Sequence, residues 1–411
     1  LVELALKYGT PLYVFSKKMI EGRCSEIREQ FIKRYEGSSA YYAGKAFLTL
    51  AMCQIVEKEG LGLDVVSGGE LHTAIKAHFP PERIIFHGNN KTRQEIEMAV
   101  DQGVGRIAVD WEGEIDIIDK VAGLKGKQAS ILLRVTPEVE ALTHKYIQTG
   151  HRGSKFGIPL ERIPYVLKKS LSLKNLNLMG FHFHLGSQIK DCRPYIEAVD
   201  VVTKMMSNLR DDFGFITKEL DIGGGFWIGG FEKTMSKPIS YFVDPVMERI
   251  KARCSKFELP MPYIAIEPGR WIVGEAGITL YTVGAIKEIP GSITYVSVDG
   301  GMSDNPRPAL YEAKYYAEVA NKMGRPKDKI VTVAGRCCES GDILIEDLAV
   351  PSDLKPGDIL AVFNTGAYNY SMASNYNMLP KPAVVFVDKG KDMLVVERET
   401  YDDLLAKQKF I

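Results

Sequence analysis

Short apolar runs alternate with amphipathic segments through the first two thirds of the chain. From about Ser39, an apolar run is followed by a turn and then by apolar positions recurring every three or four residues, the alternation of strands with helices. Helices are predicted at Thr92–Asp101, Glu114–Val121 and Tyr195–Leu209. The eight predicted strands are Ala40–Lys45, Gly62–Val66, Arg83–His87, Arg106–Asp110, Ala129–Val135, Leu178–His184, Leu220–Gly223 and Tyr263–Glu267. This count predicts a TIM-like (β/α)8 barrel, with a doubly wound sheet as the alternative.

Predicted helices largely cease after about Gly277, and strand-like runs then follow one another with Pro and Gly turns between them. An early run, Leu12–Phe15, precedes the barrel pattern and could pair with these later strands. We therefore predict an α/β plus all-β protein: a barrel over residues 25–277, and a β-rich, sandwich- or barrel-like domain from residues 1–24 plus 278–411. The later strands are predicted at Thr279–Ile286, Ile293–Val298, Ile330–Ala334, Ile343–Ala349, Ile359–Phe363, Ala383–Val387 and Met393–Glu397.

Composition and charge narrow the class of partner. The 411 residues suffice for two domains with separate cores. Lys plus Arg and Asp plus Glu both number 52, so the formal net charge is zero. Because no broad basic field favours nucleic acid or an anionic membrane, we expect a small-molecule partner. No apolar run reaches the roughly 18 residues of a membrane helix, so we expect no membrane span.

The six cysteines are widely scattered and form no C-x-x-C pair, which fits neither a zinc ribbon nor a disulfide framework. We therefore expect a reducing, cytoplasmic location. Glu3 and Lys7 interrupt the apolar residues at the start, so we expect no signal peptide there. The cysteines are Cys24, Cys53, Cys192, Cys254, Cys337 and Cys338.

Unusual polar and glycine-rich residues gather where the predicted barrel strands end. Catalytic groups of such barrels lie at the C-terminal ends of the strands, so these residues are the candidates for chemistry. They are Lys45, Asp64, His87–Asn89, Arg134, His182–Ser187, Gly223–Gly225 and Glu267–Arg270.

Lys45 and the triple glycine suggest an aldehyde that carries a phosphate. The apolar setting Tyr41–Phe47 would lower the pKa of Lys45 and favour imine formation, although a lysine can also cap a strand at the surface. Gly223–Gly225 can present backbone N–H groups to a phosphate or serve as a flexible turn. The segment has neither the G-x-G-x-x-G nor the Walker pattern.

Three further groups allow more than one interpretation. A buried Glu267 would need a cation, which a protonated pyridinium or Arg270 could provide. His182 and His184 alternate on one strand face, but no carboxylate or third histidine is near in sequence, so we expect packed or stacking histidines and no metal site. Adjacent Cys337 and Cys338 cannot comfortably bind one zinc, which leaves one working thiol or two structural thiols.

Taken together, these stretches resemble the fold-type III decarboxylases that depend on pyridoxal 5′-phosphate (PLP), and most specifically the diaminopimelate decarboxylases among them. The matching segments occur in family order from Tyr41 to Asn377 and cover nearly the whole chain. They are YYAGKAF, GLGLDVVSGGEL, HGNNK, GSKFGI, GFHFHLGSQI, LDIGGGF, IEPGR, VDGGMSDNPRPALY, CCESGD and NTGAYNYSMASNYN. The family fold, a PLP-binding barrel plus a β domain, agrees with the pattern above.

The resemblance implies a role for each matching residue. Lys45 would bind PLP covalently, His184 would stack on its ring, and Glu267 would pair with the pyridine nitrogen. Cys338 would be the proton donor, so the implied catalytic residues are Lys45, Cys338 and His184. The cofactor phosphate would be surrounded by Ser187, Gly223, Gly224, Gly225, Arg270 and Tyr368, and Gly269 would also bind the cofactor. The implied substrate contacts are Arg270, Arg307, Tyr311, Glu339 and Tyr368.

The implied activity is decarboxylation of meso-2,6-diaminopimelate to L-lysine and CO2, the last step of lysine biosynthesis. In this family Cys338 and Glu339 would reach the partner's site, which implies a homodimer with shared active sites. An ornithine- or arginine-type decarboxylase is an alternative, but Arg307 would repel a distal cation. A racemase of similar fold pairs the pyridine nitrogen with Arg, and Glu267 argues against it. A non-catalytic homologue would have little reason to retain Lys45, Glu267 and Cys338.

Overall fold

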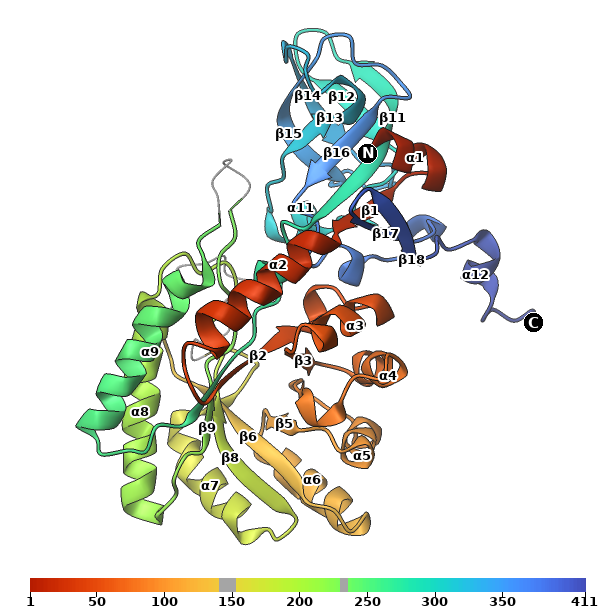
Figure 1. Ribbon diagram of the computed structural model, residues 1–411. Coiled ribbons are helices and arrows are strands. Elements are labelled where there is room, and N and C mark those ends of the chain that lie inside the picture. Colours follow the sequence, from red (N-terminus) through yellow and green to blue (C-terminus); the bar gives the residue numbers. More distant parts are fainter. Residues whose placement is uncertain (140–152, 230–235) are drawn as a thin grey trace. The chain divides into compact units, whose positions relative to one another are not determined.

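The computed structural model describes residues 1–139, 153–229 and 236–411 (Figure 1). The described chain divides into two compact units. The barrel unit comprises Glu21–Trp227 and Lys237–Trp271, and the β unit comprises Leu1–Ile20, Ile228–Ser236 and Ile272–Ile411. Among the described residues, no helix has both the length and the apolar character required to cross a membrane.

Within the described residues of the barrel unit, eight parallel strands close into a ring. Their order is β2-β3-β4-β5-β6-β8-β9-β10, and β10 pairs with β2. Because β5 pairs with β6, the ring has no open edge, which confirms the barrel and excludes the doubly wound sheet. The strands are β2 (Ser38–Ala43), β3 (Gly62–Val65), β4 (Ile84–Phe86), β5 (Arg106–Val109), β6 (Ala129–Thr136), β8 (Leu176–His182), β9 (Glu219–Asp221) and β10 (Tyr263–Ile266); short β7 (Ile158–Pro159) extends from β6.

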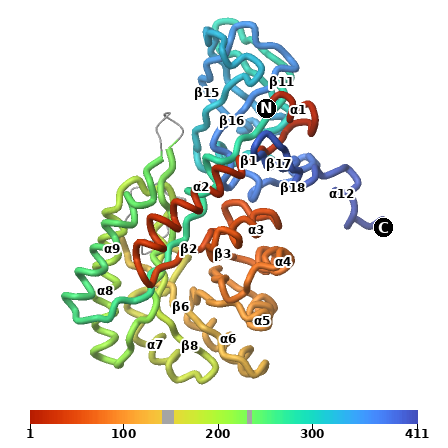
Figure 2. The backbone as a smooth tube through the Cα atoms, in the orientation of Figure 1, coloured from red at the N-terminus to blue at the C-terminus, as the bar shows by residue number. Residues whose placement is uncertain are grey.

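Helices lie outside this ring (Figures 1 and 2). Each buries an apolar stripe, as in α8, where Ala198, Val202 and Met206 recur at helical spacing on the buried face. The barrel helices are α3 (Leu50–Lys58), α4 (Gly68–Lys76), α5 (Arg93–Gln102), α6 (Glu114–Leu124), α7 (Ile163–Ser172), α8 (Arg193–Phe213) and α9 (Ile239–Lys256). The chain passes between the units within α2 (Lys17–Ile27) and α10 (Arg270–Val273).

The start of α5 shows how local sequence fixes the loops at the strand ends. Thr92 and Glu95 form a capping box, in which the Thr92 side chain accepts from Glu95 N and Glu95 Oε2 accepts from Thr92 N at 2.9 Å. The other oxygen of Glu95 accepts from Gly68 N at 2.7 Å. One side chain therefore ties the first turn of α4 to that of α5.

The β unit is built on a mixed sheet in the order β15-β14-β12-β11-β1-β17-β18, with β16 bridging β11 and β13. β1 (Leu12–Ser16) runs antiparallel to β11 and parallel to β17, which confirms the predicted return of the early strand. The others are β11 (Gly277–Glu288), β12 (Thr294–Val298), β13 (Ala317–Val319), β14 (Lys329–Ala334), β15 (Ile343–Val350), β16 (Ile359–Phe363), β17 (Ala383–Asp388) and β18 (Lys391–Val396), with short helices α1 (Val2–Tyr8), α11 (Arg307–Tyr311) and α12 (Tyr401–Leu405).

Candidate active site

Lys45 lies directly after β2, in a 3₁₀ turn that spans Gly44–Ala46. Its Nζ is 3.9 Å from Oδ2 of Asp64, which belongs to the neighbouring strand β3. The Lys45 side chain is 38% exposed and that of Asp64 only 1%, so the amine is accessible while its counter-charge is buried. Burial raises the pKa of Asp64, and neighbouring His87 and Lys45 oppose that rise. Asp64 therefore orients the amine at this end of the barrel.

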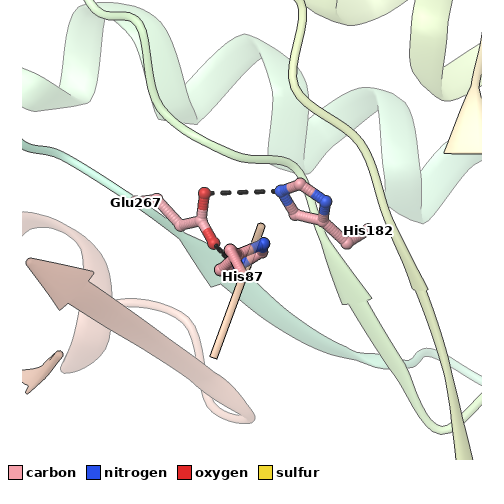
Figure 3. Close-up of side chains that lie close together, drawn as sticks. All are labelled: His87, His182 and Glu267. Atoms are coloured by element: carbon pink, nitrogen blue, oxygen red, sulfur yellow. Dashed lines mark hydrogen bonds and ion pairs between the residues drawn. The ribbon is translucent and has the colours of Figure 1, made fainter. Parts of the chain in front are cut away.

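Glu267 follows β10 and lies between two histidines from other strands (Figure 3). His87, just after β4, places Nε2 2.6 Å from Oε1. His182, the last residue of β8, places Nε2 3.3 Å from Oε2. The imidazole centroids are 4.5 Å apart at an interplanar angle of 61°. Both of these carboxylate contacts are with histidines, whereas Arg270, the alternative partner, donates to Ser187 Oγ at 3.3 Å.

The electrostatics of this cluster favour an ionised Glu267. Burial disfavours its charge, but His87 and His182 outweigh burial and hold the pKa of Glu267 well below its usual range. Nearby Asp221 behaves oppositely, because burial and the charge of Glu267 raise its pKa well above the usual range. Its Oδ1 accepts from Gly223 N at 2.8 Å.

His184 lies beside the triple-glycine turn. Gly224 N donates to His184 Nδ1 at 3.2 Å. Burial lowers the pKa of His184 well below its usual range, and the positive charge of Lys45 lowers it further. A neutral ring that accepts at Nδ1 must carry its proton at Nε2. The turn thereby fixes the tautomer of His184.

The glycines are required by close backbone approach. A Cβ on Gly224 would lie 2.0 Å from the carbonyl oxygen of Glu267, and one on Gly225 would lie 2.0 Å from that of Gly186. Gly223 and Gly225 also have φ values of +70° and +98°, where side chains are strained. The turn is therefore a packed element that joins the ends of β8, β9 and β10.

Sequence reasoning named His87 and Arg134 only as polar residues at strand ends, and it missed their partners and the buried pair of Lys91 and Glu114. His87 stood out only as part of a polar stretch, and its link to Glu267 depends on the closure of the ring. Nη1 of Arg134 lies 3.4 Å from Oδ1 of Asp110, and Cζ of Arg134 lies 4.4 Å from the ring centroid of Phe156. A buried pair, Lys91 Nζ and Glu114 Oε1 at 2.7 Å, anchors the loop after β4, where Lys91 also donates to the carbonyl of Gly88.

The β unit brings together a second set of predicted residues. Arg307 is buried at the start of α11, and its guanidinium carbon lies 5.0 Å from the ring centroid of Tyr311 and 5.6 Å from that of Tyr368. Such cation–π contacts hold a guanidinium in place while leaving its N–H donors available for an anion.

Cys338 and Glu339 are exposed in the same unit, whereas Cys337 is buried. Burial raises the pKa of the Cys337 thiol, which makes it the less reactive of the adjacent pair. Cys338 N donates to Asn377 Oδ1 at 2.7 Å. Asp342 then binds both functional loops, since its carboxylate accepts from Cys337 N at 2.8 Å and from Met302 N at 2.7 Å. The predicted residues therefore form two sets, one in each unit.

Comparison with known proteins gives the family of the chain. Residues 17–274 match the family model described as the pyridoxal binding domain of pyridoxal-dependent decarboxylases. The chain is 49% identical to a diaminopimelate decarboxylase of Bacillus subtilis over 98% of its own length and 92% of that protein. It is 43% identical to one of Staphylococcus aureus, covering 98% and 94% of the two chains.

Solved structures give the same result. The crystal structure of the M. jannaschii diaminopimelate decarboxylase in complex with L-lysine superposes with a TM-score of 0.93 at 35% identity, covering 100% of this chain and 94% of the other. The Helicobacter pylori enzyme complexed with L-lysine gives 0.90 at 31% identity, with 98% of each chain covered. With full-length identity of this order, the chain belongs to the diaminopimelate decarboxylase family of pyridoxal-dependent decarboxylases.

Proposed function

We propose that this protein binds PLP at the C-terminal end of the barrel and decarboxylates meso-2,6-diaminopimelate to L-lysine and CO2, as the last step of lysine biosynthesis. The observation that carries the proposal is the presence of an amine, Lys45, and a buried, ionised carboxylate, Glu267, at the same end of one closed barrel. Similarity to diaminopimelate decarboxylases supports the choice of substrate.

The residues present fit PLP in their chemistry. Lys45 offers an amine for the aldehyde, and Asp64 keeps that amine near the ring of strands. Gly223–Gly225, Gly269, Ser187 and Arg270 offer N–H, hydroxyl and guanidinium donors suited to a phosphate. Tyr368 of the β unit would add a hydroxyl.

Bound PLP supplies an electron sink for the electron pair released when a C–CO2 bond breaks. Glu267 would hold a proton at the pyridine nitrogen by charge pairing, which is the condition under which the sink is strong. His184, neutral and held by Gly224 N, would pack its ring face against the cofactor. Lys45 would bind the cofactor and release it to the substrate amine.

The β unit would select the substrate. Arg307 would bind the distal carboxylate through two N–H donors, Tyr311 would add a hydrogen bond, and Glu339 would pair with the distal ammonium. Arg270 and Tyr368 would complete the contacts. A buried guanidinium disfavours substrates such as ornithine and arginine, whose distal group is a cation.

Cys338 would deliver a proton from Sγ to the carbon that has lost CO2. We infer a homodimer in which Cys338 and Glu339 complete the active site of the partner subunit, with residues 25–277 as the cofactor domain and residues 1–24 plus 278–411 as the domain that also builds the interface. Since all six cysteines lie in the described part and are free, we also infer a cytoplasmic location.

Release of CO2 from meso-diaminopimelate, measured beside lysine, ornithine and arginine with saturating PLP, tests the proposal. We expect release from diaminopimelate alone. Faster release from ornithine or arginine would instead assign a basic amino-acid decarboxylase. A folded, PLP-loaded protein that acts on none of the four would be a non-catalytic homologue.

A further inference from the structure

The carboxylate of Glu267 is held from two sides by His87 and His182 (Figure 3). The three residues come from the ends of β4, β8 and β10 and are 4%, 1% and 4% exposed. Bulk water therefore competes weakly for the carboxylate oxygens, and both oxygens face an imidazole nitrogen. A side chain contacted at both oxygens has little freedom to rotate.

The proton on His182 can be assigned from its surroundings. Burial lowers the pKa of His182 to about 3, so the ring is neutral at neutral pH and carries one N–H. Nε2 faces the ionised carboxylate of Glu267 at 3.3 Å, so Nε2 must carry the proton and donate it. Nδ1 is then a buried acceptor without a partner among the described residues. This arrangement satisfies His182 only while Glu267 remains ionised.

A metal ion is the competing interpretation, because the three ligand atoms lie within 4.8 Å of one another. Zinc with bonds of roughly 2.0–2.2 Å in tetrahedral geometry needs ligand atoms about 3.3 Å apart or more. His87 Nε2 and Glu267 Oε1 are only 2.6 Å apart. That spacing is a direct contact between the two atoms and leaves no room for an ion bound to both.

We infer that His87 and His182 are positioning residues that fix the orientation and the negative charge of Glu267, and through it keep the pyridine nitrogen of the cofactor protonated. The inference rests on the proposed function, because the role of Glu267 toward PLP belongs to that proposal. Neither histidine needs to touch the reacting atoms. Their effect reaches the substrate only through Glu267.

Other charged groups also surround Glu267, so the two imidazoles must be separated from them experimentally. Asp64 from β3 and Asp221 from β9 oppose the charge of Glu267, whereas Arg134 from β6 favours it. The remaining titratable neighbours are Lys45 after β2 and His184 after β8. All of them remain in place when only His87 and His182 are changed.

The test uses holoenzyme loaded with PLP that is labelled with ¹⁵N at the pyridine nitrogen, whose chemical shift reports protonation. Wild-type protein should show a protonated nitrogen from pH 6 to 9. We expect the double variant His87→Leu/His182→Leu, which removes both imidazoles at similar volume, to move the shift to that of Glu267→Gln. The double variant His87→Gln/His182→Gln, which retains N–H donors, should restore most of the wild-type shift. His72→Leu, at an exposed position of α4, is the matched control.

Kinetics give an independent readout. Loss of a group that acts on the electron sink should lower kcat tenfold or more and change KM by no more than about twofold. A protonated nitrogen in the double leucine variant would overturn the inference. So would loss of PLP from that variant while Glu267→Gln retains it, since the histidines would then act elsewhere. Loss of PLP from both the double leucine variant and Glu267→Gln would support a role of the histidines that is exerted through Glu267. One equivalent of zinc in the holoenzyme, lost with the histidines, would replace the inference by a metal site.

The nitrogen shift is read without substrate, which separates the two proposals. Histidine-dependent protonation in a protein inactive toward diaminopimelate would refute the proposed activity and leave the positioning role intact. Full activity toward diaminopimelate, with a nitrogen whose protonation does not depend on the histidines, would refute the positioning role and leave the proposed activity intact.

Discussion

Gly224→Ala tests whether the triple-glycine turn is a packed element of the site or a flexible connection. The added methyl carbon would lie 2.0 Å from the carbonyl oxygen of Glu267 and 2.8 Å from its carbonyl carbon. Ordinary contact begins near 3.4 Å, so the two segments must separate by more than 1 Å. Both contacting atoms are main-chain atoms, so the strain cannot be relieved by a side-chain rotation.

Overpacking of this kind costs about 1–3 kcal/mol, and each kcal/mol lowers the Tm of a domain of this size by roughly 2–4 °C. We therefore expect a drop of several degrees in the Tm measured by calorimetry. PLP retention should fall as well, because the shift displaces Glu267 and breaks the hydrogen bond from Gly224 N to His184 Nδ1.

Gly22→Ala provides a matched control in the same unit. Gly22 lies inside α2, and an added Cβ would meet nothing within 4 Å. Helix propensity then favours Ala by up to about 1 kcal/mol, so Tm should be unchanged or slightly higher and PLP retention unaffected. A Gly224→Ala protein with the Tm and PLP affinity of wild type would show that the turn is flexible, and the reasoning would be wrong.

The remaining predictions concern substrate selection by Arg307 and the sharing of active sites between subunits. Arg307→Ala should lower kcat/KM for meso-diaminopimelate by roughly 10- to 150-fold, because it removes a charge-assisted contact of about 1.5–3 kcal/mol. The PLP affinity should stay within about twofold. An equal loss of kcat/KM and of PLP affinity would show that Arg307 has a structural role. Mixing Lys45→Ala with Cys338→Ala subunits should restore part of the activity, because one of the two sites in a heterodimer would have both residues; proven heterodimers without activity would contradict shared sites.

The barrel could be predicted because most of its strands are short apolar runs, as in β4, where all three residues are apolar and buried. The predicted and observed ends of the strands differ by a few residues, because residues near the end of a strand are also typical of loops. Closure of the barrel ring was harder to predict, because neither the sequence of β5 nor that of β6 shows that the two strands pair. β13 was missed because three residues give too little pattern.

The candidate residues could be predicted, because catalytic groups of barrels generally lie at the ends of the strands. The contacts that these residues make could not be predicted. His87, His182 and Glu267 are separated by 95 and 85 positions in the sequence, and only the closed ring brings them together. No carboxylate or third histidine is near His182 along the chain, yet Glu267 and His87 lie beside it in space. Likewise, only the burial pattern distinguishes Cys338 from Cys337.

The proposed function requires that a cofactor aldehyde be attached at Lys45, at the barrel end where Glu267 is held ionised. Borohydride reduction of the PLP-loaded protein, followed by peptide mass spectrometry, tests this attachment. We expect one pyridoxyl group per chain, located on Lys45, with loss of the visible cofactor absorbance. A label on another lysine, or an unlabelled Lys45 in folded protein saturated with PLP, would contradict it.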